Sequence, residues 1–252
     1  MRSRLSVAAA TFVLAACART QVVQGPCAKV NGADVCTWGE MKGDAITSFG
    51  ATIPLTAIKN APASVPMAWP PVAEAAIALP DAVRLATGYQ LLTIYWEPGG
   101  HPPATFAVPH WDFHFYSLSA AQLAALSCAD SAKPAVLPAN YVLPDMAIPG
   151  VGMLAGLCVP QMGMHSLPGA DMTATAPFHA SMVIGYYHQQ PVFVEPMLAH
   201  ATLLAAKSFE LDVPTIPGQA SGVHTPAHFR ADYDSAAAAY RFAFSTAAAG
   251  TK

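Results

Sequence analysis

Prolines divide this chain into short segments. The 252 residues include 23 prolines, and after residue 20 every long apolar stretch meets Pro or Gly before the roughly 18 residues that a membrane-spanning helix needs. The chain is 54% hydrophobic and only 11% charged, so it can bury a full core, and charge-rich disorder is excluded. The sequence therefore predicts one soluble globular domain over residues 26–248.

The charged residues give no sign of a nucleic-acid partner. Lys and Arg total 12 against 15 Asp and Glu, and the basic residues are scattered singly along the chain. A nucleic-acid surface needs clustered basic residues to neutralise phosphates. We therefore expect no nucleic acid to bind.

The N-terminus has the pattern of an export signal. Arg2 and Arg4 precede a short apolar run, Leu5–Val13, and the segment ends in Leu14-Ala15-Ala16-Cys17, which resembles a bacterial lipobox. This pattern predicts a lipoprotein signal peptide over residues 1–16, lipidation of Cys17 and a tether over 17–25. Ala18 favours the periplasmic face of the outer membrane. The alternative is an ordinary secretory signal in which the cysteine is accidental.

Four further cysteines are expected to form disulfides, because export places them in an oxidising compartment. Cys27 and Cys36 flank an Asn31-Gly32 turn, and pairing outward from that turn places the two cysteines opposite each other in a hairpin. By elimination Cys128 pairs with Cys158. Two buried thiols are the alternative for this second pair.

The segments between the prolines favour an α+β fold, mainly an antiparallel β sheet or barrel with a few flanking helices and a C-terminal helix. Capping-box residues Ser119 to Gln122 predict a short helix ending at Ser127. Apolar patterns predict helices over 197–207 and over 231–246. Strands are predicted at residues 45–53, 91–96, 105–116, 181–187 and 192–195.

The segment His110–Tyr116 alternates polar and aromatic residues. In a strand, this order places His110, Asp112, His114 and Tyr116 on one face and Trp111, Phe113 and Phe115 on the other. Histidine and aspartate are good ligands for divalent transition metals. Alternate residues lie about 6.6 Å apart and the outer histidines about 13 Å apart, so a flat strand offers one ion only an adjacent pair. A solvated or hydrogen-bonded polar face is the alternative.

Several blocks of sequence resemble one protein family. They are the segments 96–103, 109–116 and 162–165, and Gly185-Tyr186-Tyr187 followed by Phe193-Val194-Glu195-Pro196-Met197. Over about residues 45 to 230 the chain is similar to an uncharacterised family of exported bacterial proteins, related to a sigma-E-regulated, ring-forming protein of unknown function. The resemblance implies a homo-oligomer and supplies no reaction. The chain departs from the family at Ser166, where Trp is usual, and at 188–191, where a glycine-containing turn is usual.

The family blocks contain six of the candidate polar residues. These are His101, His110, Asp112, His114, His165 and Glu195. Glu195 lies in the apolar run Val192–Glu195, where an unpaired buried carboxylate would cost several kcal/mol. We therefore expect convergence on a divalent transition metal, zinc or copper, with His110, Asp112, His114, His165 and Glu195 as ligands and His101 and Tyr116 as possible outer partners.

The predicted cluster leaves three classes of function open. As an enzyme, the protein would use a metal-activated water or polarise a small substrate. As a binding module, it would hold a metal or a small ligand without turnover. As a structural protein, it would be a non-catalytic ring-forming subunit of the cell envelope. If histidines are ligands, metal affinity should fall as the pH drops through about 6.5, the ordinary histidine pKa.

Overall fold

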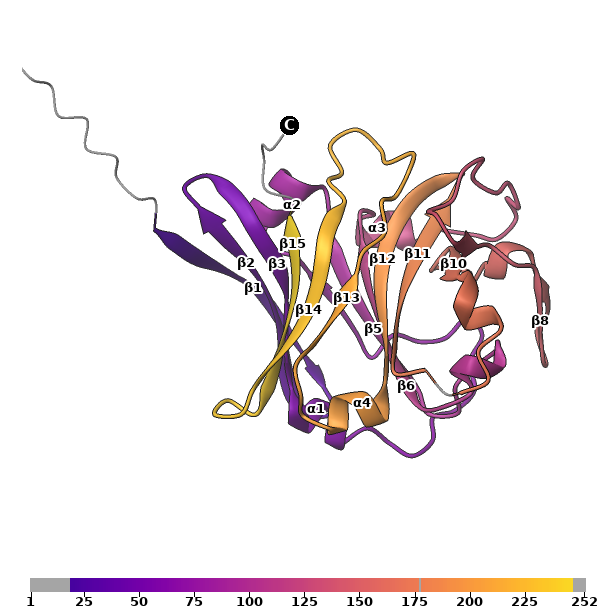
Figure 1. The fold of residues 1–252 in the computed structure, drawn as a ribbon, viewed down its shortest axis with the longest axis horizontal. Coiled ribbons are helices and arrows are strands. Elements are labelled where there is room, and N and C mark those ends of the chain that lie inside the picture. The colour runs from indigo at the N-terminus through magenta and orange to yellow at the C-terminus, as the bar shows by residue number, and fades with distance from the viewer. Residues whose placement is uncertain (1–18, 177, 247–252) are drawn as a thin grey trace, which may run out of the picture.

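The computed structural model describes residues 19–176 and 178–246, and it folds as two antiparallel β sheets packed face to face (Figure 1). The first sheet has the order β1-β2-β3-β15-β14-β13, and the second β4-β5-β6-β12-β11-β10-β7. A separate hairpin joins β8 (Met146–Ile148) to β9 (Gly152–Leu154). This arrangement confirms the predicted class of mainly antiparallel sheet with few helices. Cys17 and the predicted signal peptide lie outside the described residues.

The first sheet combines the two ends of the described chain. Its strands are β1 (Thr20–Val30), β2 (Ala33–Lys42), β3 (Ala45–Pro54), β13 (Phe209–Asp212), β14 (Pro226–Asp234) and β15 (Ala239–Thr246). Because β1 begins at Thr20 and pairs with β2, residues 20–24 belong to the sheet, and the predicted tether over 17–25 is wrong for them. Val22 and Val23 lie there between Gln21 and Gln24, and β-branched valine favours a strand.

The second sheet carries the conspicuous polar residues. Its strands are β4 (Ala75–Ala78), β5 (Leu91–Glu97), β6 (His110–Tyr116), β7 (Tyr141–Val142), β10 (Met164–Pro168), β11 (Ala180–Tyr187) and β12 (Gln190–Ala199). Helices are short: α1 (Leu55–Lys59), α2 (Asp81–Thr87), α3 (Ala120–Ala124) and α4 (His200–Leu204), with single 3₁₀ turns at 104–106, 155–157 and 169–172. The Ser119–Gln122 capping box that opens α3 is confirmed. Within residues 19–176 and 178–246, no helix has the length and apolarity to span a membrane.

The predicted C-terminal helix over 231–246 is wrong. This segment forms the end of β14, a turn and β15. Tyr240, Phe242 and Phe244 alternate along β15 and are fully buried against the second sheet's core, so the period of two prevails over the helical spacing. Asp234 accepts hydrogen bonds from the backbone N–H groups of Ala236 and Ala237, which stabilises a turn in the alanine run. The predicted helix over 197–207 is likewise reduced to α4, because β12 continues to Ala199.

Both predicted disulfides are confirmed. Cys27 lies opposite Cys36 in the β1–β2 pairing, as the Asn31-Gly32 turn requires, and the two are bonded with Cα atoms 4.0 Å apart. Cys128 is bonded to Cys158, with Cα atoms 5.8 Å apart. Two disulfides indicate an oxidising environment and therefore an exported protein.

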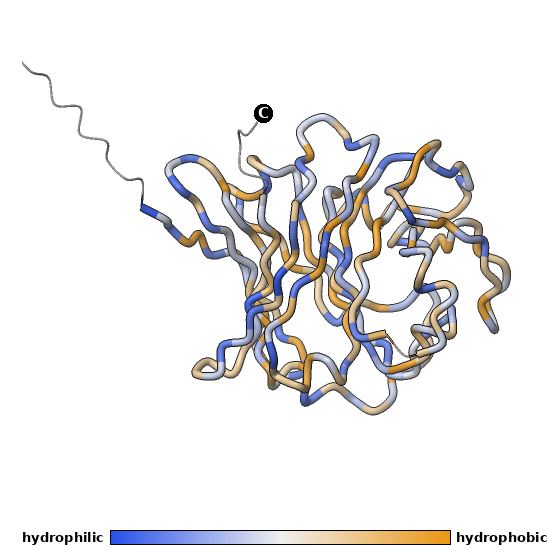
Figure 2. The backbone as a smooth tube through the Cα atoms, in the orientation of Figure 1, coloured by the Kyte–Doolittle hydropathy of each residue, from blue (hydrophilic) through white to orange (hydrophobic). Residues whose placement is uncertain are grey.

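Two layers of apolar packing lie on the two faces of the second sheet. Trp111, Phe113 and Phe115 of β6 point toward the first sheet and pack with its buried aromatic rings. A second apolar cluster lies on the opposite face, beneath α3 and the β8–β9 segment, and includes Tyr116 and Phe193. Figure 2 shows hydrophobic and hydrophilic residues interleaved along the strands. The polar side of β6 therefore faces this outer cluster rather than solvent.

Candidate metal centre

The polar face of β6 is buried. His110, Asp112 and His114 are buried, with exposed fractions of 0%, 6% and 1%, and they alternate with the aromatic residues as the sequence predicted. Other strands and one loop bring further histidine and carboxylate side chains next to these residues. They divide the candidate ligands into two groups, which we call the His114 set (His114, His165 and Glu195) and the His110 set (His101, His110 and Asp112).

The His114 set is assembled across three strands. Phe193 pairs with Tyr116 and Met197 with Asp112, so Glu195 of β12 lies opposite His114 of β6. The Nε2 atom of His114 is 3.4 Å from a carboxylate oxygen of Glu195. His165 comes from β10, and its ring centre is 5.7 Å from that of His114. All three candidate ligand atoms lie within 4.8 Å of one another.

A glycine lets β10 contribute to this group. His165 pairs with Gly185 of β11, and Gly185 pairs with Phe193 of β12. The Phe193 ring occupies the space that a Cβ at Gly185 would fill, so only glycine fits there without a shift of the ring. That ring contacts both histidines, with ring centres 4.9 Å from His114 and 5.1 Å from His165. Phe193 therefore packs against both imidazoles and limits their movement.

The His110 set lies farther along the same face of β6. The Nε2 atom of His110 is 3.4 Å from one oxygen of Asp112, and Nε2 of His101 is 4.0 Å from the other. His101 comes from the loop after β5, and its ring packs edge-on against that of His110. Two ligands of a tetrahedral zinc ion, each about 2.0 to 2.1 Å from the metal, lie roughly 3.3 Å apart. The 3.4 Å distances in the two sets match that spacing.

Backbone carbonyls orient three of the four histidines. The Nδ1 atoms of His101, His110 and His165 are 2.8, 2.7 and 2.9 Å from the carbonyl oxygens of Pro102, Val108 and Leu157. A carbonyl oxygen only accepts, so each Nδ1 must carry the proton and each Nε2 must present a lone pair. Metal-binding histidines usually have this arrangement, in which the outer hydrogen bond fixes the ring and its tautomer.

Several buried ligand atoms lack a hydrogen-bond partner among the described residues. They are Nε2 of His110, Oδ1 of Asp112, both ring nitrogens of His114 and one carboxylate oxygen of Glu195. Leaving a buried polar atom unsatisfied costs about 1 to 3 kcal/mol. One cation in each set would satisfy four of these five atoms, since they lie in two pairs: Nε2 of His110 with Oδ1 of Asp112, and Nε2 of His114 with the Glu195 oxygen.

Burial shifts the pKa values of the histidines and of the carboxyl groups in opposite directions. It lowers the pKa of all four histidines, to about 4 for His110 and His165, so their imidazoles are neutral at neutral pH. Burial also raises the pKa of Asp112 to about 6 and that of Glu195 well above its ordinary value, where the nearby Asp112 carboxylate adds to the rise. Neutral imidazole is the form that binds metal, and a cation would stabilise both carboxylates.

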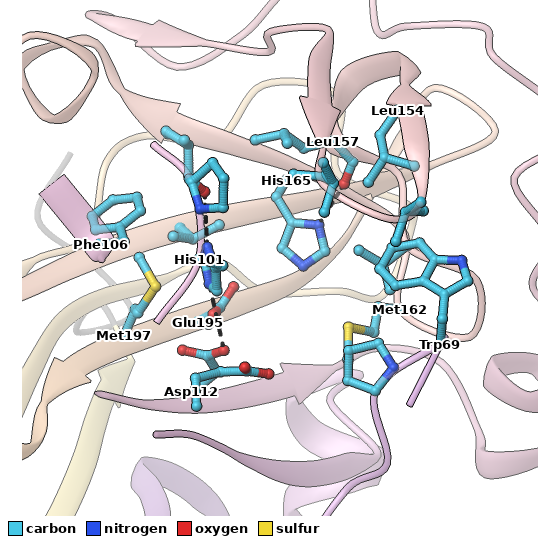
Figure 3. A pocket seen from close by; sticks show the side chains of 18 of the residues that line it. Trp69, His101, Phe106, Asp112, Leu154, Leu157, Met162, His165, Glu195 and Met197 are labelled. Carbon is cyan, nitrogen blue, oxygen red and sulfur yellow. Dashed lines mark hydrogen bonds and ion pairs between the residues drawn. The ribbon is translucent and has the colours of Figure 1, made fainter. Parts of the chain in front are cut away.

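Both sets face one cavity of about 270 Å³ on the outer side of the second sheet. Figure 3 shows His101, Asp112, His165 and Glu195 directed into it. The remaining wall is almost entirely apolar and comes from the segment 67–71, the hairpin 148–154 and residues such as Leu157 and Met162. The arrangement can bind one or two ions at its polar floor beside a small apolar space.

Four of the five predicted ligands line this cavity, and the fifth, His110, lies beside Asp112 without lining it, so the five do not surround one point. His101, predicted as an outer partner, belongs with His110 and Asp112 as a candidate ligand. Tyr116 stacks on the His114 ring, and its hydroxyl donates to the Met162 carbonyl oxygen, so it supports the site. Sequence reasoning missed Glu97, which lines the cavity, and the carbonyl oxygen that orients His165. Glu97 lies opposite His110, a signal available only once β5 and β6 are paired.

Comparison with known proteins found no match. No family model matches the chain, and searches of curated proteins and of solved structures found nothing that resembles it closely enough to count. The family resemblance based on the sequence blocks therefore stays a prediction. The geometry of the two sets is the ground for assigning a function.

Proposed function

We propose that this protein is an exported metal-binding protein that holds two divalent transition-metal ions, one in the His114 set and one in the His110 set. The observation that carries the proposal is the pairing of unsatisfied, fully buried ligand atoms within each set. Satisfying those atoms with metal removes the cost of burying them alone.

The donor atoms favour zinc as the first ion to test. Each set offers two imidazoles and one carboxylate, which is a common zinc donor group and also suits copper or ferrous iron. Three protein ligands leave one coordination position for water or a small ligand, as in zinc sites that act on other molecules. When bound, such an ion acts as a Lewis acid on that fourth ligand. The chain's own residues orient the imidazoles and exclude bulk water.

Zinc titration of the metal-free chain tests this function. We expect two ions per chain at about micromolar affinity or better, measured by calorimetry and by elemental analysis near neutral pH. Below about pH 6 the affinity of the His110 set should fall, because protons then compete for Asp112, whose pKa is raised to about 6. The affinity of the His114 set should rise further with pH as Glu195 loses its proton.

The expected pH dependence differs from that of ordinary histidine ligands. The sequence predicted a loss of affinity near pH 6.5, but burial lowers the pKa of His110 and His165 to about 4. Competition by protons therefore moves from the imidazoles to the carboxyl groups. A chain that binds no zinc, copper or iron would contradict the proposal. The sets would then be structural polar clusters, and the ring-forming envelope subunit would become the preferred function.

We further propose that the exported protein is anchored by lipid at Cys17 on the periplasmic face of the outer membrane. The disulfides support export, and the lipobox spelling supports the anchor. Because β1 starts at Thr20, such an anchor would hold the first sheet close to the membrane. Mass spectrometry of detergent-extracted protein should find Cys17 as the acylated N-terminus. A soluble product cleaved at another residue would contradict the anchor.

A further inference from the structure

We propose that the metal-loaded cavity binds a small molecule with an apolar body and a single carboxylate, which the positive charge of the bound ions would hold at the cavity floor. The inference rests on the proposed function, because both metal sets must be filled. It goes beyond that function by naming the chemical class of the ligand. Two features of the cavity carry it: its charge once loaded, and the composition of its walls.

The loaded cavity has an excess of positive charge. Two divalent ions bring four positive charges, and the acidic side chains among the described lining residues are Glu97, Asp112 and Glu195. Even with all three ionised, one positive charge is left in a buried space. An unbalanced buried charge is costly, so a bound monoanion completes the site.

The walls exclude most other anionic ligands. Apart from the acidic and histidine side chains of the floor, the described lining contains no hydroxyl, amide or cationic side chain. A sugar acid would therefore leave most of its hydroxyl groups without a side-chain partner, at a cost for each. A hydrocarbon body meets Met67, Trp69, Leu154 and Leu157 instead. The volume, about 270 Å³, lies just below the roughly 300 to 1,000 Å³ of typical ligand pockets.

The cavity has a natural optical reporter. Trp69 lines it and is 43% exposed, whereas Trp38, Trp96 and Trp111 are buried elsewhere in the fold. Figure 3 shows the Trp69 ring beside Met162 at one side of the space. A ligand that enters should change Trp69 fluorescence, and Trp69→Phe should remove that signal.

Octanoate is the probe, with 1-octanol as its uncharged match. Each is titrated into the full chain loaded with two zinc ions, and into the metal-free chain, with Trp69 fluorescence and calorimetry as readouts. We expect octanoate to bind the zinc-loaded chain at least about tenfold more tightly than it binds the metal-free chain. It should also bind the zinc-loaded chain about tenfold more tightly than 1-octanol binds the zinc-loaded or the metal-free chain. Both differences are expected because the charge interaction needs both the metal and the carboxylate. Shortening the acid to hexanoate should weaken binding about fourfold per methylene removed.

Two neighbouring residues of β9 provide matched variants. Leu154 lines the cavity, whereas Met153 is 69% exposed and points away from it. Leu154→Gln should weaken octanoate binding about tenfold by removing apolar contact, while Met153→Gln should leave it unchanged. Neither residue belongs to a metal set, so zinc content should stay at two ions in both variants.

The outcomes separate this inference from the function on which it rests. A chain that binds no zinc overturns both. A chain that binds two zinc ions but shows no octanoate binding, or binds octanoate and 1-octanol equally, overturns the ligand class alone. Equal octanoate binding with and without zinc also overturns it, because the apolar walls would then account for the affinity without the ions.

Discussion

His165→Ala and Glu195→Gln are each expected to reduce the zinc content from two ions to one per chain. Each removes a ligand of the His114 set while the His110 set keeps all of its donors. The affinity of the altered set should fall about a hundredfold or more, equivalent to about 2.7 kcal/mol. Elemental analysis and calorimetric titration measure both quantities. Asp112→Asn should give the complementary result and remove the other ion.

The fold should survive these substitutions. Most of the packing comes from the aromatic side of β6 and from the two disulfides, which none of the variants touches. Glu195→Gln should leave the metal-free chain at least as stable as the parent, because a buried carboxyl group is replaced by an amide of the same shape. His188→Ala is the control, since His188 is exposed and paired with Asp130. Retention of two zinc ions in all the ligand variants would disprove the assignment.

Loss of the Cys128–Cys158 disulfide should affect both stability and metal binding. The bond closes a loop of 30 residues, and removing it with Cys128→Ser and Cys158→Ser should cost roughly 3 to 4 kcal/mol of unfolding free energy. Cys158 follows Leu157, whose carbonyl oxygen accepts a hydrogen bond from Nδ1 of His165. Loosening this segment should therefore lower zinc affinity at the His114 set about 10- to 100-fold, as loss of an outer hydrogen bond does elsewhere.

The other disulfide provides the matched comparison. Cys27 and Cys36 join β1 to β2 in the first sheet, away from the cavity. Replacing both with serine should cost roughly 2 to 3 kcal/mol, because the closed loop is shorter, but should leave zinc affinity unchanged. Denaturant unfolding and zinc titration of the two double variants distinguish these effects. Equal zinc affinities in the two would disprove a link between Leu157 and the metal centre.

Local patterns in the sequence determined several features of this protein. Strict alternation over His110–Tyr116 separated the polar face of β6 from its aromatic face. The Asn31-Gly32 turn set the register that brings Cys27 opposite Cys36. Each of these features depends on residues within a few positions of one another, because the side-chain period and the turn geometry are local properties of the backbone.

Local patterns failed where two periods fitted the same residues. Tyr233, Tyr240 and Phe244 have a helical spacing, but Tyr240, Phe242 and Phe244 also alternate, and burial against the aromatic side of β6 selected the strand. Such a choice depends on a partner far away in the chain. Apolar residues contribute most where they meet other apolar surface, and local spacing does not specify that surface.

Only the tertiary structure decided how the candidate ligands divide. Strand β12 lies beside β6 and places Glu195 opposite His114, while β10 lies two strands farther out and reaches the group across Gly185. The loop after β5 places the His101 ring against that of His110. His101, which was expected to be an outer partner, therefore belongs to the second set. Sequence patterns specify which face a side chain occupies. Which distant strands become neighbours, and so which ligands meet, is decided by the packing of the whole sheet.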